Sequence, residues 1–135
     1  EITALDEHFS ITLKPVFEAL KKFPTQVMVG SSGTFDTLSD IFCARYDIHK
    51  PVEEIETPLT LAGFYEIYEE LLKKNRQQRM MIPGMIEMRV DMIVVACCLI
   101  RYILHHHPFN RIRVSTYSLK EGVLATMIGE AKLTT

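Results

Sequence analysis

Two glycines separated by two serines make up the part of this sequence that is best suited to binding an anion. The stretch consists of Gly30, Ser31, Ser32, Gly33 and Thr34. Glycine lets a backbone approach a ligand closely, and the N–H groups that begin a helix point toward an anion placed there. The spacing matches neither of the common phosphate-binding glycine motifs. The residues alone therefore leave two interpretations open, a phosphate-binding loop and a purely structural strand-to-helix turn.

A cluster of basic residues further along the chain could meet the same anion. The cluster comprises Lys73, Lys74, Arg76 and Arg79, at the end of a predicted helix and in the turn after it. Positive charge suits a helix C-terminus because the helix dipole is negative there. Arg79 is the candidate ligand because a guanidinium can bind phosphate through two parallel hydrogen bonds. The alternative, an arginine that only caps helix carbonyls, stays open, and Arg89 is a second candidate.

The remaining chemically active side chains predict no catalytic or metal site. His105, His106 and His107 are consecutive, and successive residues on a helix point about 100° apart, so one ion cannot readily take all three. They are expected to form a solvated helix end. Asp91 is either a buried carboxylate with a role or part of a structural pair with Arg89. No group of residues has zinc-like spacing, and no nucleophile with a base can be assigned from linear sequence.

Composition excludes several classes of protein. The chain has 135 residues, of which 47% are hydrophobic and 24% charged, enough for one domain with a real core. A net charge of −2 argues against a dedicated nucleic-acid-binding protein. The longest uncharged apolar run, 92–100, is far shorter than the roughly 20 residues of a membrane span. Cys43, Cys97 and Cys98 form no C-x-x-C pair, so we expect reduced core cysteines and a cytoplasmic protein with no membrane partner.

The first half of the chain predicts helix, strand and helix. Apolar residues at steps of three and four predict an amphipathic helix that ends near Lys22, with Pro15 kinking it or beginning a second piece. The apolar run 27–29 predicts a strand buried on both faces. A helix is expected over 35–46, and a loop over 47–58.

The second half predicts two helices, a strand and a last helix. Thr57 and Pro58 suit a helix cap and first position, before a helix that reaches about residue 72. A break at 82–85 precedes a helix over 86–105, which is apolar nearly all round and is expected to be the core pillar. Alternation predicts a strand over 111–115, and a capping-box pattern at Ser118 predicts a helix over 119–128.

Two strands are too few for a stable sheet that carries this many helices. We therefore expect an α/β fold in which the two strands lie side by side and parallel. We also expect that residues 1–135 are a piece of a larger chain, because no methionine begins the sequence. The unpaired strand edge of such a piece would favour self-association, so a homo-oligomer is expected.

An ordered set of motifs spans nearly the whole chain and resembles a known family. The set comprises Gly30 to Thr34, Arg79, Ile82-Pro83-Gly84-Met85, Arg89-Val90-Asp91-Met92-Ile93, and 114–124. It is similar to the second lobe of the exopolyphosphatase and guanosine pentaphosphate phosphohydrolase (Ppx/GppA) family, whose members have the actin-like ATPase, or ribonuclease H-like, fold. The resemblance implies the later part of lobe two, with two parallel strands and about five helices. Ser32 stands where the family's G-[ST]-G-G-T turn has a glycine.

The resemblance also implies an activity and a site. It implies a phosphohydrolase that releases terminal phosphate from inorganic polyphosphate or guanosine pentaphosphate, using Mg²⁺ and a glutamate-activated water. The implied ligand-binding residues are Gly30, Ser31, Ser32, Gly33, Thr34, Arg79 and Arg89. The family's first lobe, general-base glutamate and Asp-x-Gly-Gly-Gly-Ser loop precede anything present here, so the chain alone is expected to be inactive, with no catalytic residue and no bound metal. The alternative is a non-catalytic module that senses (p)ppGpp or another nucleotide.

Overall fold

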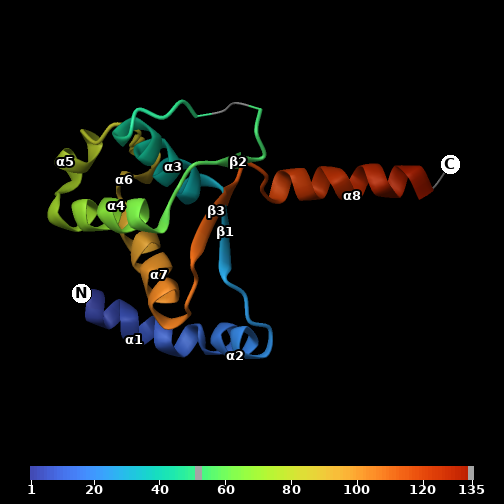
Figure 1. Cartoon of the computed structure of the whole chain (residues 1–135), viewed down its shortest axis with the longest axis horizontal. Coiled ribbons are helices and arrows are strands. Elements are labelled where there is room, and N and C mark those ends of the chain that lie inside the picture. The colour runs from blue at the N-terminus through green and yellow to red at the C-terminus, as the bar shows by residue number, and fades with distance from the viewer. Residues whose placement is uncertain (51–52, 134–135) are drawn as a thin grey trace.

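A parallel pair of strands, β1 (Val27–Ser31) and β3 (Arg111–Ser115), lies at the centre of the computed structural model, which describes residues 1–50 and 53–133 (Figure 1). Gly30 lies opposite Val114 in the register. Parallel strands need a long crossover connection, and the helices between residues 33 and 106 supply it. The predicted parallel pairing is therefore confirmed.

A short third strand, β2 (Glu56–Thr57), pairs antiparallel with the other edge of β3 and gives the order β1-β3-β2. The sequence predicted only loop here, because two extended residues leave no periodic pattern. Pro58 follows β2 directly. Proline has no N–H to donate to a ladder, which limits the strand to its two residues. Residues 51–52 of the predicted loop lie outside the described residues.

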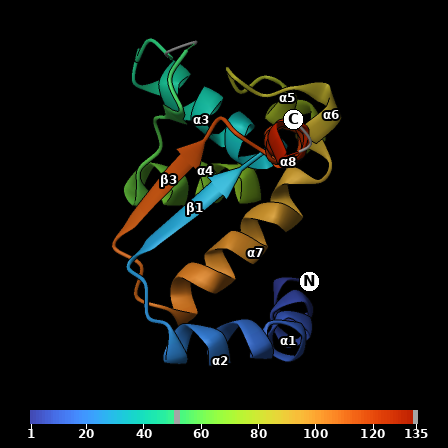
Figure 2. The ribbon, with the colours of Figure 1, turned by 90° about the vertical axis from the view of Figure 1, so that its right-hand side faces the viewer.

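Eight helices surround or extend from this sheet in the described part of the chain. They are α1 (Ile2–Thr12), α2 (Lys14–Lys22), α3 (Gly33–Arg45), α4 (Leu61–Lys73), α5 (Arg76–Met80), α6 (Glu87–Val90), α7 (Ile93–His106) and α8 (Leu119–Leu133). Figure 2 shows α3, α4 and α7 behind the β1–β3 pair, on one face of it. Helix α8 extends away from the body in the opposite direction (Figure 1). None of the described helices combines the length and apolar character that crossing a membrane requires.

The core lies between the sheet and the three helices that cover one face of it. Fully buried residues come from α3 (Leu38, Ile41), α4 (Phe64, Ile67, Leu71), α6 and α7 (Val90, Ile93) and β3 (Val114). The other face of the sheet is open. Val29 is 64% exposed there, so the prediction that 27–29 is buried on both faces is wrong. Alternating side chains point to opposite faces of a strand, and on this outer face Val29 borders a pocket with residues at the start of α8, such as Gly122 and Ala125.

Two helix boundaries differ from those predicted, because tertiary contacts compete with local sequence signals. Thr57 does not cap a helix, since it belongs to β2, and Thr60 caps α4 instead by accepting a hydrogen bond from the Gly63 N–H at 3.0 Å. The helix predicted over 86–105 is interrupted at residues 91–92. Val90 and Ile93, on either side of the interruption, are both buried in the core.

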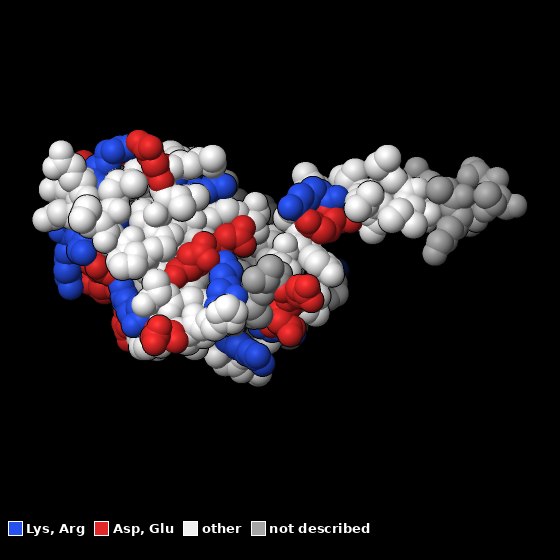
Figure 3. Space-filling view, turned by 90° about the horizontal axis from the view of Figure 1, so that it is seen from above, with Lys and Arg blue, Asp and Glu red and all other residues white. Residues whose placement is uncertain are grey.

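Other local predictions are confirmed. The first helical segment breaks at Leu13, and Pro15 lies in the first turn of α2. Helix α8 begins at Leu119, where the Glu121 carboxylate accepts hydrogen bonds from the N–H and hydroxyl of Ser118. Figure 3 shows charged side chains near the base of α8 and a mainly uncharged surface along the rest of its described length. Apolar side chains of α8 such as Leu124 and Met127 are exposed there.

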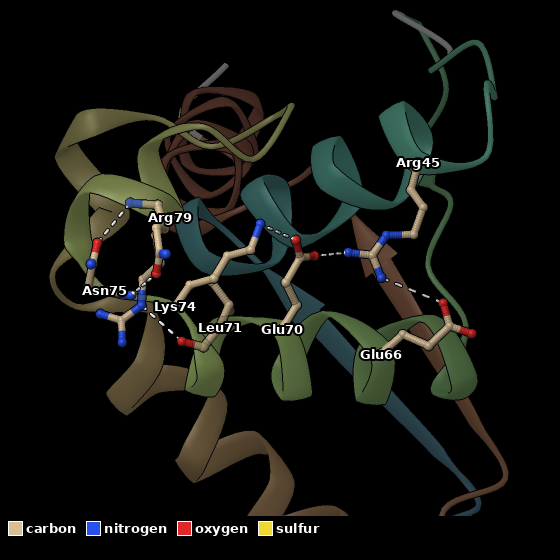
Figure 4. Close-up of polar contacts among 8 residues, drawn as sticks. Arg45, Glu66, Glu70, Leu71, Lys74, Asn75 and Arg79 are labelled. Carbon is tan, nitrogen blue, oxygen red and sulfur yellow. Dashed lines mark hydrogen bonds and ion pairs between the residues drawn. The ribbon is translucent and has the colours of Figure 1, made fainter.

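A cluster of ion pairs joins α3 to α4 (Figure 4). The Glu70 carboxylate accepts hydrogen bonds from Lys74, at 2.7 Å, and from Arg45. The contact with Lys74 is the main cause of a lowered Glu70 pKa, and Arg45 adds to it. A carboxyl whose pKa is lower in the folded chain stabilises the fold above its ordinary pKa and loses that contribution as the pH falls.

We therefore expect Glu70→Gln to flatten the acid side of the stability profile. The wild-type free energy of unfolding should fall as the pH drops below about 4.5, the ordinary pKa of this carboxyl, and on through its lower pKa in the folded chain. The variant should lose less over the same range, because Gln cannot be protonated. Urea unfolding at a series of pH values measures this. Glu69→Gln is the matched control, since Glu69 is 59% exposed and 3.7 Å from Lys73. Parallel profiles for wild type and Glu70→Gln would contradict the assignment.

Candidate functional site

The predicted phosphate-binding loop is a one-residue turn between strand and helix. Strand β1 ends at Ser31 and α3 begins at Gly33, with Ser32 as the residue between them. The Ser32 side chain makes no capping hydrogen bond to α3. The first N–H groups of a helix have no partner inside the helix. The turn therefore presents backbone donors beside the carboxyl end of β1, as the sequence predicted for Gly30 to Thr34.

The Arg89 guanidinium lies directly against Gly33. A Cβ atom at position 33 would overlap with that guanidinium, so any residue other than glycine would require the arginine side chain to shift. The Nε atom of Arg89 is buried and has no hydrogen-bond partner among the described residues. A cavity of about 270 Å³ is bordered by residues 31–35, by Arg89, and by apolar residues of α7 that include Leu99 and Ile100. The loop and Arg89, 56 positions apart in sequence, are thus brought together.

A glycine turn holds Arg89 in this place. Gly84 has a φ of +91°, which favours glycine. A Cβ atom on Gly84 would lie 2.6 Å from the backbone carbon of Asp40 and the backbone nitrogen of Ile41. The turn at residues 81–84 therefore packs against the backbone of α3. Because α6 follows this turn at once, the same contact sets the position of Arg89 relative to the start of α3.

Ser32 has a backbone conformation that suits glycine. Its φ is 67° and its ψ is −178°, a region that residues with a Cβ atom adopt only under strain. The resemblance to the Ppx/GppA family implies a glycine at this position. The Ser32 hydroxyl makes no capping hydrogen bond to α3 that would offset this strain. Local strain is therefore concentrated at the centre of the candidate loop.

We expect Ser32→Gly to stabilise the chain. Removing the Cβ atom relieves a strained conformation, which should raise the free energy of unfolding by about 1 kcal/mol. Chemical denaturation of the two proteins measures the difference. Ser31→Gly is the control, because Ser31 lies in β1, where glycine usually costs about 0.5–1 kcal/mol. A Ser32→Gly variant that is less stable than wild type would show that the serine is accommodated without strain.

Arg79 lies away from this cavity. Its Nε atom donates a hydrogen bond of 2.9 Å to the carbonyl oxygen of Leu71, near the end of α4 (Figure 4). The short helix α5, which carries Arg79, begins with a capping box formed by Asn75 and Gln78. This capping box was not predicted, although its Asn-x-x-Gln spacing is present in the sequence. Arg79 thus caps helix carbonyls with one nitrogen, and it does not border the cavity that Arg89 and the loop share.

The other candidate groups lie in structural contacts. Asp91 is exposed and pairs with Arg76 at 3.0 Å, so it is neither a buried carboxylate nor the partner of Arg89. His106 donates to the carbonyl of Tyr102 and His107 donates to that of Thr25, at 2.8 and 2.7 Å, so the two rings point to different partners. Burial raises the pKa of the Cys97 thiol to about 12, which keeps it protonated and poorly nucleophilic.

No metal cluster is present in residues 1–50 and 53–133. No three His, Cys, Asp or Glu side chains gather closely enough there to hold an ion. No residue of the described part is therefore assigned as a ligand of the Mg²⁺ ion that the resemblance implies.

Comparisons with known proteins give one family. The model of the Ppx/GppA phosphatase family matches residues 2–131. Among solved structures, an exopolyphosphatase from Cytophaga hutchinsonii is 38% identical with a TM-score of 0.89, over 96% of this chain and 42% of that chain. A Ppx/GppA family member from Aquifex aeolicus is 20% identical with a TM-score of 0.67, over 97% of this chain and 47% of that one, and so supports the fold alone. The search of curated proteins found no match. The chain thus spans less than half the length of these solved relatives.

Proposed function

Because the chain belongs to the Ppx/GppA phosphatase family, we propose that it is the later part of the second actin-like lobe of a phosphohydrolase. The substrate is inorganic polyphosphate, from which the intact protein releases terminal phosphate. The 38% identity with the Cytophaga hutchinsonii exopolyphosphatase supports polyphosphate. Guanosine pentaphosphate is the other substrate that the family resemblance implies. A phosphate-release assay with each compound distinguishes the two substrates.

One observation carries this proposal, namely the Arg89 guanidinium lying against Gly33 at the start of α3. Phosphoryl transfer depends mainly on positioning and on neutralising negative charge. The loop from Gly30 to Thr34 supplies backbone donors, and Arg89 supplies a permanent positive charge whose Nε has no partner in the described residues. Together they form one wall of a phosphate site. Arg79 stays a candidate contact through the guanidinium nitrogens that Leu71 does not use.

In this proposal the chain binds the phosphate of the substrate. The catalytic groups belong to other parts of the intact protein. The general base and the ligands of Mg²⁺ would lie in parts of the protein outside these residues, so no step is assigned to the metal here. The free, buried cysteines support a reducing, cytoplasmic environment. The open sheet face at Val29 and the apolar surface of α8 support self-association of the chain.

Phosphate release by the intact protein tests the proposal. Purified protein is incubated separately with polyphosphate and with guanosine pentaphosphate, and inorganic phosphate is measured over time. We expect release from polyphosphate that is strongly reduced by Gly33→Val, because the new side chain occupies the space of the Arg89 guanidinium. Phosphate release from guanosine pentaphosphate but not from polyphosphate would show that guanosine pentaphosphate is the substrate. Binding of either compound without release would favour the sensing module instead.

A further inference from the structure

Three residues with side-chain hydroxyls border the cavity that Arg89 and the turn share. They are Ser31 at the end of β1, Ser32 in the turn and Thr34 in the first turn of α3. None of these hydroxyls makes a hydrogen bond to another residue in the described part of the chain. A hydroxyl can donate one hydrogen bond, and phosphate oxygens accept them. The cavity therefore offers side-chain donors in addition to the backbone N–H groups and the Arg89 guanidinium.

The backbone distinguishes Ser32 from the other two residues. Ser31 lies in a strand and Thr34 in a helix, and both geometries suit a residue with a Cβ atom. Ser32 has a φ of 67° and a ψ of −178°, a combination that only glycine adopts without strain. Residues held in such conformations cluster at ligand-binding sites. The outlier at Ser32 therefore indicates a functional role for its side chain.

No contact within the described chain accounts for a serine at this position. Its side chain does not cap α3, and the residue is exposed, so it adds nothing to the core. The neighbouring Gly33, in contrast, is explained by Arg89, whose guanidinium takes the space of a Cβ atom. The Ser32 hydroxyl is thus available to a ligand and has no structural partner to lose.

The position of Ser32 is suitable for contact with a bound phosphate. Ser32 directly precedes α3, whose first N–H groups have no partner inside the helix. The residue also borders the same cavity as Arg89, whose buried Nε has no hydrogen-bond partner in the described residues. A phosphate in this cavity would meet backbone donors, a permanent positive charge and the Ser32 hydroxyl together.

We infer that the Ser32 hydroxyl is a substrate contact, which donates a hydrogen bond to a phosphate group of the bound polyphosphate. The inference rests on the proposed function, and it adds a side-chain donor to the backbone donors of the loop. It also gives the strain at Ser32 a physical reason. Serine lowers the stability of the turn but strengthens phosphate binding, whereas glycine would give a more stable chain that binds phosphate less tightly.

Two variants of the intact protein separate the effect of the hydroxyl from that of the strain. Ser32→Ala removes the hydroxyl and keeps the Cβ atom, so its stability in urea unfolding should match that of the wild type. Ser32→Gly removes both, so it should be more stable. Isothermal titration calorimetry with tripolyphosphate measures binding. Both variants should bind about tenfold more weakly than the wild type, at the lower end of the range for a hydrogen bond to a charged group. The KM for phosphate release should rise by a similar factor, with little change in kcat.

Ser10→Ala is the matched control for the loss of an exposed hydroxyl. The Ser10 hydroxyl donates to the carbonyl of Glu7 at 2.7 Å. Both residues lie on α1, which Figure 2 shows at the end of the molecule opposite to the carboxyl ends of β1 and β3. Neither the affinity for tripolyphosphate nor the KM should change in this variant.

The same measurements distinguish failure of this inference from failure of the proposed function. Phosphate release by the wild type, with unchanged affinity and KM in both Ser32 variants, would overturn the Ser32 contact alone. Weaker tripolyphosphate binding by both variants of a protein that releases no phosphate would support the contact and overturn the proposed activity. Weaker binding in only one of the two variants, or no binding of tripolyphosphate to the wild type, would overturn the inference.

Discussion

Replacing Arg89 with alanine in the intact protein is expected to lower kcat/KM for phosphate release by about 10- to 150-fold. This range corresponds to the roughly 1.5–3 kcal/mol of a hydrogen bond to a charged group. The physical reason is the position of the guanidinium, which lies against Gly33 where the N–H groups of α3 begin. Steady-state kinetics with polyphosphate measure the effect. The melting temperature should change little, because the Arg89 Nε makes no hydrogen bond within the described residues.

Two further variants make this prediction specific. Arg89→Lys should recover only part of the activity, since an ammonium keeps the charge but lacks the planar pair of donors. Arg79→Ala should lower the free energy of unfolding by about 1 kcal/mol, because the Leu71 carbonyl loses its donor. Full activity in Arg89→Ala together with a large loss in Arg79→Ala would assign the phosphate contact to Arg79.

Gly84→Ala is expected to lower the free energy of unfolding by about 2–5 kcal/mol. The φ of +91° costs a residue with a Cβ atom about 1–2 kcal/mol. The added atom would also lie 2.6 Å from the backbone of Asp40 and Ile41, and backbone cannot rotate away as a side chain can. Overpacking of this kind typically costs a further 1–3 kcal/mol. Urea unfolding followed by circular dichroism measures the loss.

Gly122→Ala is the matched control for this substitution. Nothing lies within 4 Å of a Cβ atom at position 122, which is in the exposed helix α8. Alanine is a better helix former than glycine, so this variant should be more stable by about 0.5–1 kcal/mol. If both variants lose stability equally, the turn at Gly84 does not make the contact with α3 described above.

The sequence predicted much of the fold because several of its signals are local. Helical spacing and caps determine helices such as α4 and α8 within a few residues of chain. The apolar run at 27–29 and the alternation at 111–115 were sufficient to predict β1 and β3. The exposure of Val29, the strand at Thr57 and the break before Ile93 were not predictable in this way. Each depends on which elements pack nearby, and a one-dimensional pattern does not contain that information.

The candidate site was also predictable only in part. The sequence by itself determined the loop from Gly30 to Thr34, because a strand, a small-residue turn and a helix start are adjacent in the chain. It favoured Arg79, at the basic end of a predicted helix, and offered Arg89 as a second candidate. Only the tertiary structure placed Arg89 against Gly33 and Arg79 against the end of α4. The physical reason is the close contact of the Gly84 turn with α3, which joins segments more than 40 residues apart.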